Sequence, residues 1–301
     1  MHKVVGTLAA AVLNPVVRFV CLRSEWARPY LWTRLIAPKL RWRDYRFQAK
    51  STFNCKFTGT TSDIIQSSIY YFGIWEPFVG GFIAKRLATG DVVIDIGANI
   101  GYVSLLAASI VGPSGRVVSI EASNSIFKQL NANVALNSAT QIRTICGAVS
   151  DTEGELELSY GPAENSGATS LVRNFGGATE IVHAAPLAHW LTAQEISEAR
   201  LIKIDVEGAE MKVLNSILPL LPRMRSDLEI VCEVSPDECK DSFEPTMAEF
   251  AKFGFHVYSL PHDNIEAYLR PSAVRPVALP LKNFPDRRTE IVVSRRRENA
   301  L

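Results

Sequence analysis

The strongest chemical signal in the sequence is a glycine-containing loop, Asp95-Ile96-Gly97-Ala98-Asn99-Ile100-Gly101, which follows an apolar run. Gly97 allows the chain to turn sharply, and Gly101 allows the next helix to begin close to a ligand. The unpaired N–H groups at the start of that helix suit an anionic group. Glu121 ends the next apolar run, twenty residues after Gly101, where a carboxylate can accept hydrogen bonds from both hydroxyls of a ribose. These residues together predict a nucleotide-type ligand.

The glycine spacing separates two classes of cofactor. Dinucleotide-binding folds use G-x-G-x-x-G, whereas Gly97 and Gly101 have the spacing G-x-x-x-G and Asp95 precedes them. A carboxylate at Asp95 would repel a pyrophosphate, but it suits a positive amino group such as that of S-adenosylmethionine. The loop therefore favours S-adenosylmethionine over NAD. An NAD-linked oxidoreductase stays open as the alternative, as does a buried turn without a ligand.

A second group of carboxylates lies in the segment Leu201-Ile202-Lys203-Ile204-Asp205-Val206-Glu207-Gly208-Ala209-Glu210. It reads as the end of an apolar strand and the start of a helix. Ligands of open α/β sheets bind at the carboxyl ends of the strands, so Asp205 and Glu207 are expected to face the same crevice as Asp95. Either could take a proton from a hydroxyl or hold it by a hydrogen bond. Glu207 could instead only favour a helix N-terminus.

Other groups in the chain offer alternatives for this chemistry. His183 and His256 are alternative bases, although each lies in or beside an extended segment where a packed or surface histidine is more usual. Asp205 and Glu233 end two neighbouring predicted strands and could hold Mg²⁺ against paired substrate oxygens. Because no complete ligand set is readable, we predict no metal site.

The elements that position these residues follow from the pattern after Asp91. Short apolar runs alternate with helical segments at 101–111 and 123–137, which is typical of βαβ units and a parallel sheet. We therefore predict an α/β fold. The predicted strands are 92–96, 116–122, 142–149, 201–206, 228–234, 255–260 and 289–294.

The rest of the chain divides into three parts. Residues 1–50 form a basic, aromatic extension interrupted by prolines, and residues 51–87 form a mixed segment that precedes the core and ends in a helix at 77–87. Residues 88–301 hold the alternating domain. Within it, the glycine-rich insertion at 151–190 predicts a hairpin and a short helix, and the proline-rich segment at 270–287 predicts irregular structure.

Composition and charge restrict the function classes. The chain has 301 residues, of which 47% are hydrophobic and 21% charged, which excludes a disordered or fibrous protein. Its net charge of +1 hides an asymmetry, because residues 1–50 carry +8 and the remainder −7. The acidic body argues against nucleic acid as a partner.

The basic extension allows contact with an acidic partner or anionic lipid. The apolar run within residues 4–22 is too short to span a bilayer. A helix packed on the body is the default expectation, and a helix at the membrane surface is the alternative. Five cysteines without paired spacing fit a reducing compartment. We therefore expect a cytoplasmic protein with possible peripheral membrane association.

The motifs DIGANIGY, the strand-end Glu121 and LIKIDVEGAEMKVL resemble the FkbM family of S-adenosylmethionine-dependent methyltransferases. The resemblance covers residues 75–234, and GIWEP at 73–77 resembles the segment that precedes the family's fold. It implies a class I (Rossmann-like) methyltransferase sheet of seven strands, six parallel and one antiparallel near an edge, flanked by helices and preceded by the helical extension. It also implies O-methylation of a hydroxyl, often on a sugar or polyketide-type product.

The resemblance has limits within the site. The family usually has Glu-Pro-Asn where this chain has Glu121-Ala122-Ser123, and the glutamate is kept. The resemblance also gives Glu76 a role in the site, although Glu76 could equally cap the helix that begins at Pro77. The predicted acceptor is a small molecule or glycan, and a non-catalytic S-adenosylmethionine-binding module is the alternative. The predicted cofactor-binding residues are Glu76, Asp95, Gly97, Ala98, Asn99, Gly101, Glu121, Ala122 and Val149, and the predicted catalytic residues are Asp205 and Glu207.

Overall fold

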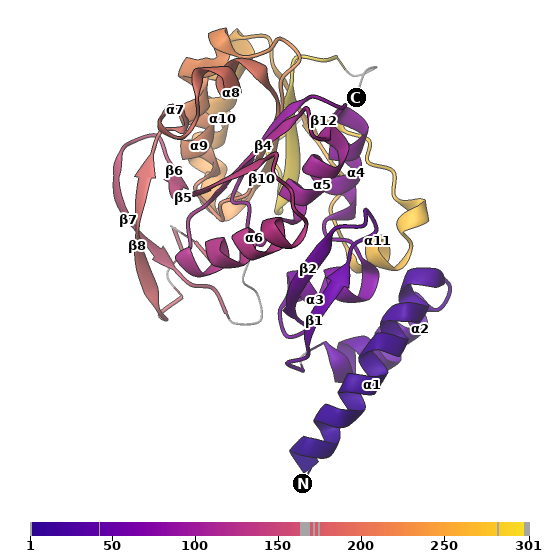
Figure 1. Cartoon of the computed structure of the whole chain (residues 1–301). Coiled ribbons are helices and arrows are strands. Elements are labelled where there is room, and N and C mark those ends of the chain that lie inside the picture. Colours follow the sequence, from indigo (N-terminus) through magenta and orange to yellow (C-terminus); the bar gives the residue numbers. More distant parts are fainter. Residues whose placement is uncertain are drawn as a thin grey trace.

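A central eight-stranded sheet organises the protein (Figure 1). The computed structural model describes residues 2–41, 43–162, 169–170, 172–173, 175–281 and 283–297, with side chains from residue 12 onward. The sheet has the order β12-β11-β13-β10-β9-β3-β4-β5. Its strands are β3 (Val92–Ile96), β4 (Arg116–Glu121), β5 (Ile142–Cys146), β9 (Ala199–Ile204), β10 (Glu229–Val234), β11 (His256–Ser259), β12 (Leu279–Pro280) and β13 (Thr289–Ser294).

The strand directions are those of a class I methyltransferase sheet. β5, β4, β3, β9 and β10 run parallel. β13 is antiparallel to both β10 and β11, so β11 points the same way as the parallel strands. The prediction of six parallel strands and one antiparallel strand near an edge is confirmed, and the two-residue β12 adds an eighth strand. Every residue of β3 and β9 is buried, as expected for strands covered on both faces.

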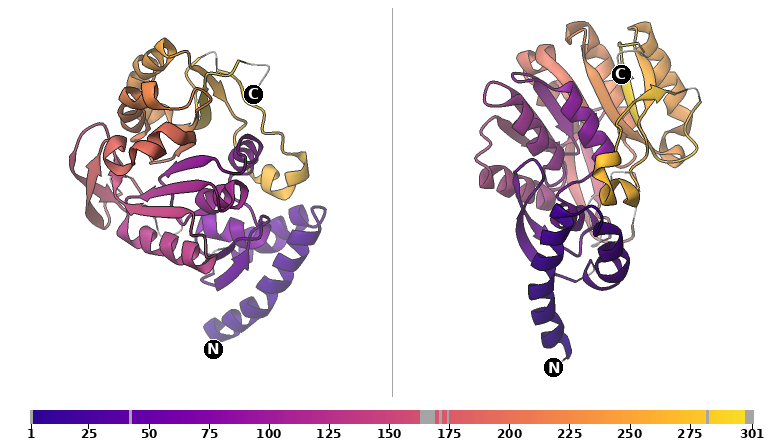
Figure 2. Two further views of the ribbon diagram at one scale, coloured as in Figure 1. Left: turned by 45° about the horizontal axis from the view of Figure 1, so that its top comes forward. Right: turned by 90° about the vertical axis from the view of Figure 1, so that its right-hand side faces the viewer.

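Helices cover both faces of this sheet (Figures 1 and 2). Ile94 and Ile96 of β3 contact the core beneath α9 and α10, whereas Val93 contacts the core beneath α4 and α5, as the two-residue period of a strand requires. Ser123 caps α6 by accepting a hydrogen bond from the Ile126 N–H. The helices are α4 (Pro77–Arg86), α5 (Tyr102–Val111), α6 (Asn124–Leu136), α8 (Ala193–Glu198), α9 (Glu210–Ile217), η3 (Leu218–Arg223) and α10 (Pro236–Lys252).

The predicted strand at 142–149 is wrong in one respect, because it divides at Gly147. The Trp190 ring lies where a side chain would stand, and a Cβ at Gly147 would be 2.4 Å from it. After this break, β6 (Ala148–Val149) leaves the main sheet and pairs with β8 (Thr179–Ala185). β8 also pairs with β7 (Gly154–Ser159) in the expected hairpin, and the short helix α7 (Leu187–Trp190) follows.

The amino-terminal extension is helical, and two of the proline breaks predicted for it are wrong. α1 (His2–Arg23) continues through Pro15. Because Pro15 has no N–H, one carbonyl of the preceding turn loses its usual partner. Pro15 is exposed, so water can hydrogen-bond to that carbonyl instead. Pro38 lies in η1 (Trp32–Leu40), a π-helix whose wider turn relieves the clash with the preceding turn. α2 (Arg28–Leu31) joins these two helices. No helix in the described residues is long and apolar enough to cross a membrane.

The extension packs on a small subdomain beside the main sheet. Val17 and Cys21 of α1 and Ile36 of η1 share a core with Tyr71 and Phe72. The buried guanidinium of Arg28 donates to the carbonyls of Cys21 and Tyr268, both at 2.7 Å. The extension is thereby tied to residues far along the chain. The subdomain comprises β1 (Arg46–Lys50), β2 (Lys56–Thr60) and α3 (Ile64–Phe72), and the tail contributes α11 (Ile265–Leu269) and η4 (Pro271–Ala273).

A buried ion pair fastens the amino ends of the central strands. Arg200 of β9 donates to Glu229 of β10 at 2.7 Å, and both side chains are almost inaccessible to water. We predict that Arg200→Met destabilises the protein by about 3 kcal/mol, because a buried carboxylate loses its main partner. Urea denaturation measures this. Lys252→Gln, which breaks an exposed pair with Glu249, is the control and should cost under about 0.5 kcal/mol; equal losses would contradict the prediction.

Candidate active site

A cavity of about 400 Å³ lies at the carboxyl ends of β3, β9 and β10. Its volume is that of a small-molecule site. Its wall also includes residues from the extension, Trp32 and Arg41, and from the tail, His262 and Tyr268. The cavity is rich in carboxylates, which are Glu76, Asp95, Asp205, Glu207, Glu233, Asp263 and Glu290.

Most of the predicted site residues line this cavity or a smaller one beside it. The main cavity includes Glu76, Asp95, Gly97, Ala98, Asn99, Asp205 and Glu207. The smaller cavity shares the loop and both catalytic candidates, and it adds Glu121, Ala122 and Val149. Two separate stretches of sequence therefore meet as expected. Gly101 lines neither cavity.

Glycine is required at Gly97 and at Gly101 for different structural reasons. Gly97 has φ +77°, and a Cβ there would lie 1.7 Å from the carbonyl oxygen of Asp205. Only glycine lets the loop approach the second motif this closely. Gly101 has φ +88°, and a Cβ would lie 2.7 Å from Leu130. Backbone conformation and packing therefore explain why glycine is required at position 101.

Glu121 closes the glycine loop. Its Oε2 accepts a hydrogen bond from the Asn99 N–H and its Oε1 accepts one from the Ser123 N–H, both at 2.9 Å. Burial raises the pKa of Glu121 to about 7, against these two hydrogen bonds. Each carboxylate oxygen keeps a second lone pair, so Glu121 can still accept ribose hydroxyls. Ala122, where the family usually has proline, leaves this arrangement intact.

Asp95 offers a polar atom that has no partner within the described residues. Its Oδ2 accepts a hydrogen bond from the Ser104 hydroxyl at 2.5 Å, whereas its buried Oδ1 has no hydrogen-bond partner. Burial raises the pKa of this carboxyl. A buried oxygen without a partner is costly, and the amino group of a bound amino acid would satisfy it. The residues present thus fit the methionine part of S-adenosylmethionine.

Glu76 approaches the cavity from outside the sheet, between Trp75 and Pro77. It makes no capping hydrogen bond to α4, so the alternative role that the sequence left open is wrong. Its buried Oε2 has no partner in the described structure. Burial raises the pKa of Glu76 to about 7, although the charge of Lys203 opposes this.

Residues with strained backbone conformations cluster around the cavity. Five non-glycine residues in the described part of the chain have positive φ, and three of them line the cavity: Glu76 (43°), Asn99 (49°) and Glu207 (52°). Such conformations cost energy and persist where the surrounding structure holds them, often at functional sites. The distribution supports a functional role for this cavity.

Each catalytic candidate is held by a cation. Asp205 Oδ2 accepts a hydrogen bond from Lys203 Nζ at 2.6 Å. Glu207 pairs with Arg288 and, at 3.7 Å, with Arg173. Burial and the neighbouring Asp205 charge raise the pKa of Glu207, against its pairing with Arg288.

Three carboxylates could in principle form a metal site. Ligand atoms of Asp205, Glu207 and Glu233 lie within 4.8 Å of one another. However, Arg288 pairs with Glu207 and, at 3.1 Å, with Glu233, and Lys203 pairs with Asp205. In this arrangement each of the three carboxylates therefore already pairs with a cation of the protein.

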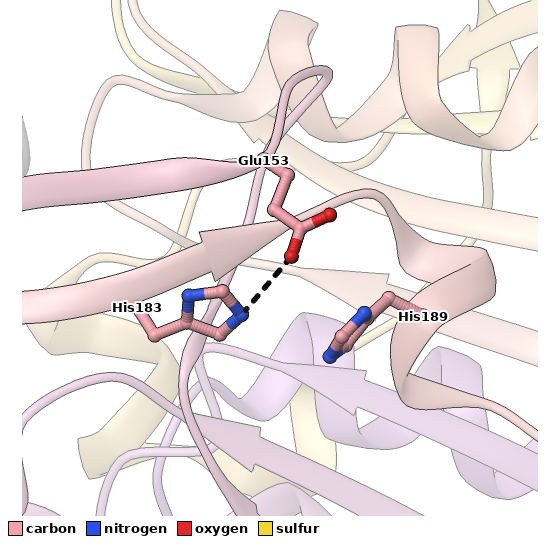
Figure 3. A group of neighbouring side chains, drawn as sticks. All are labelled: Glu153, His183 and His189. Atoms are coloured by element: carbon pink, nitrogen blue, oxygen red, sulfur yellow. Dashed lines mark ion pairs between the residues drawn. The ribbon is translucent and has the colours of Figure 1, made fainter.

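The histidines proposed as alternative bases lie elsewhere. His183, on β8, faces Glu153 and His189 at the surface of the insertion, with 3.9 Å between its Nε2 and Glu153 Oε1 (Figure 3). His256 is an exposed residue at the start of β11. Neither lines either cavity, so the structure does not support them as bases.

Several residues of the site were not found from the sequence. Lys203 could have been, because it lies two residues before Asp205 and thus on the same side of an extended segment. Arg288, Trp32 and Tyr268 had no local signal. Each reaches the cavity only through the tertiary fold.

The raised pKa of Glu76 leads to a pH-dependent stability. Between its ordinary value of 4.5 and the folded value of about 7, the folded protein binds a proton that the unfolded chain has released. The contribution of Glu76 to the free energy of unfolding therefore falls as pH rises through that window. We predict that Glu76→Gln unfolds less readily than wild type above about pH 7, by at most about 3 kcal/mol. Denaturation of the variant and of wild type at about pH 5 and about pH 8 measures the difference in their free energies of unfolding. Glu249→Gln, at an exposed site, is the control, and a pH-independent difference for Glu76→Gln would contradict the prediction.

Comparisons with known proteins agree with this geometry. The profile of the methyltransferase FkbM domain matches residues 95–257. The methyltransferase sdnD of Sordaria araneosa is 26% identical over 162 residues, which are 44% of this chain and 62% of that protein. An arsenite methyltransferase of Halobacterium salinarum is 32% identical over 63 residues, which are 21% and 16% of the two chains. The matches thus span less than two thirds of each curated relative.

A solved structure of a methyltransferase FkbM from Methylobacillus flagellatus is similar at 14% identity and a TM-score of 0.47, covering 75% of this chain and 50% of that one. The FkbM profile carries the assignment, because it matches more than half of the chain and includes both motifs that line the cavity. The chain therefore belongs to the FkbM family of S-adenosylmethionine-dependent methyltransferases.

Proposed function

We propose that the protein transfers a methyl group to a hydroxyl of a sugar or another small polyhydroxylated molecule. The supporting observation is the composition of the main cavity, where carboxylates face aromatic rings. Trp75, Tyr102 and Tyr268 line it together with Asp205 and Glu207. Carboxylates accept hydrogen bonds from hydroxyls, and aromatic faces pack against the apolar faces of sugar rings. A purely apolar acceptor would use none of the hydrogen-bond acceptors that these carboxylates present to the cavity.

The donor half of the site is proposed to be the glycine loop and the smaller cavity. S-adenosylmethionine supplies a methyl group that is already activated. Asp95 Oδ1 would accept from the donor's amino group and Glu121 from its ribose, with Ala98 and Asn99 between them. Ala122 and Val149 would border its base. The protein's task is then to orient the acceptor oxygen and exclude water.

We assign the two catalytic carboxylates different roles. Glu207 is proposed as the base, because it lines the cavity and burial raises its pKa, which makes its carboxylate a stronger acceptor for the proton of a hydroxyl. Arg288 also contacts Glu233 at 3.1 Å, so it keeps a carboxyl partner when Glu207 takes a proton. Asp205, held by Lys203 at 2.6 Å, is proposed to fix the acceptor hydroxyl in position. No step requires a metal ion.

The donor assignment predicts a binding result. Calorimetric titration should show micromolar binding of S-adenosylhomocysteine and none of NAD. Asp95→Asn should weaken that binding at least about tenfold, because the amide cannot supply the charge that pairs with the ammonium group. Glu249→Gln, at a residue that lines neither cavity, serves as the control. Unchanged affinity in Asp95→Asn would refute the assignment, and failure of both ligands to bind would favour the non-catalytic alternative.

The base assignment predicts a kinetic result. With labelled S-adenosylmethionine and a panel of sugars, amines and carboxylic acids as acceptors, methyl transfer should occur to hydroxyls. Glu207→Gln should lower kcat about 100-fold or more and remove the acidic limb of its pH profile, with S-adenosylhomocysteine binding retained. Asp205→Asn should chiefly raise the acceptor KM. Normal turnover in both variants would overturn the assignment, and transfer to amines alone would overturn O-methylation.

We also propose a cytoplasmic location. All five cysteines are free thiols, and Cys21, Cys232 and Cys239 are buried. Burial raises the pKa of Cys21 to about 11, which keeps that thiol protonated and unreactive. Free buried thiols are usual in proteins of reducing compartments.

A further inference from the structure

Helix α1 has apolar residues on two opposite faces. Val17 and Cys21 pack on the body of the protein. Val12, Val16 and Phe19 lie on another face at helical spacing, with 70%, 55% and 55% of their surface exposed. A surface helix normally buries one apolar stripe and exposes a polar face, so a second, exposed apolar stripe indicates a further binding partner.

The exposed apolar surface continues beyond the helix. Trp26 is 94% exposed and Tyr30 is 66% exposed. Both views show α1 projecting away from the rest of the fold, with the amino terminus at its far end (Figures 1 and 2). Within the described part of the chain, nothing covers this face. We call the surface formed by Val12, Val16, Phe19, Trp26 and Tyr30 the apolar ridge.

Positive charge is concentrated in the extension that carries the apolar ridge. Residues 1–50 carry ten basic and two acidic residues. Of the two acidic ones, Glu25 accepts a hydrogen bond from the Ser272 hydroxyl at 2.5 Å. The guanidinium of Arg23 stacks 3.9 Å from the Phe19 ring, so this positive charge lies directly on the ridge. Exposed basic residues follow at Arg34 and Lys39.

We propose that the apolar ridge binds the surface of an anionic phospholipid bilayer, with α1 lying in the plane of the membrane. Apolar and aromatic side chains flanked by Lys and Arg, with almost no acidic residues, are the pattern of helices that lie at the membrane interface. Tryptophan and tyrosine at the edge of such a surface suit the headgroup region. The basic residues add attraction to anionic lipids.

Charge favours a lipid surface over a second copy of the chain. A symmetric dimer formed through the ridge would bring two extensions together, each with a net charge of +8. Like charges facing one another across an interface are unfavourable. Anionic headgroups, in contrast, complement the extension.

The extension also links this surface to the cavity. Trp32 and Arg41, from the same extension, form part of the cavity wall. Arg28 joins the end of α1 to Tyr268 through two hydrogen bonds of 2.7 Å, and the Tyr268 hydroxyl accepts a hydrogen bond from the Glu76 N–H at 3.2 Å. Membrane binding would therefore hold the cavity beside the lipid surface, where an acceptor attached to a lipid could reach it.

Vesicle sedimentation of the whole chain tests this proposal without donor or acceptor, so its outcome is independent of the proposed reaction. We expect binding to phosphatidylcholine vesicles containing about 30 mol% phosphatidylglycerol, and much weaker binding to phosphatidylcholine alone. The variant Val16→Ser/Phe19→Ser/Trp26→Ser should bind at least about tenfold more weakly. Arg23→Gln/Arg34→Gln/Lys39→Gln should lose the preference for anionic vesicles.

A matched control keeps the test specific. Val172, Ile181 and Leu279 are also exposed apolar residues, at 52%, 61% and 60%, but they lie away from the extension. The variant Val172→Ser/Ile181→Ser/Leu279→Ser should bind vesicles like wild type, and thermal unfolding checks that each variant is folded. Equal binding by the ridge variant and wild type, or no binding by wild type, would overturn the proposal. A dimer that dissociates only in the ridge variant would assign the ridge to a second copy instead.

Discussion

The buried ammonium group of Lys203 allows many carboxylates to share one cavity. Its side chain is 4% exposed and lies 2.6 Å from Asp205. Burial alone would lower the pKa of Lys203, but the charges of Asp205, Glu76 and Asp95 raise it well above its ordinary value. A permanent cation below the cavity floor thus offsets repulsion among acidic groups that would otherwise drive one another to neutrality. Asp95, in the proposed donor half of the site, and Asp205, in the proposed acceptor half, both lie within the influence of this charge.

The sequence predicted the part of the site that depends on local geometry. The glycine loop after β3 and the carboxylates after β9 were expected at one edge of a parallel sheet, because strand direction alone brings such segments together. The fold class and the seven main strands followed from the same alternation of apolar runs. Two of them have the predicted ends and the ends of four others shifted by one or two residues. The remaining strand divided at Gly147, because the Trp190 ring leaves no room for a side chain there.

Residues that arrive through tertiary packing could not be predicted in this way. Trp32 and Tyr268 are separated by more than two hundred positions, yet they line one cavity. Arg288 follows a segment that was expected to be irregular, and nothing in its neighbours indicates that it pairs with Glu207 and Glu233. Helix continuity through Pro15 and Pro38 was also missed, because solvent exposure in one case and a π-helical turn in the other remove the usual obstacle.

The close approach of Gly97 to Asp205 divides the protein into a part that is fixed and a part that is free to diversify. Because no side chain fits between the two backbones, and the Asp205 N–H also donates to Ile96, the loop and the carboxylate move as one unit. Changes in substrate choice must then arise in the surrounding walls, which come from the extension and the tail. The molecule thus combines a floor held rigid by backbone contact with walls that are built from other parts of the chain.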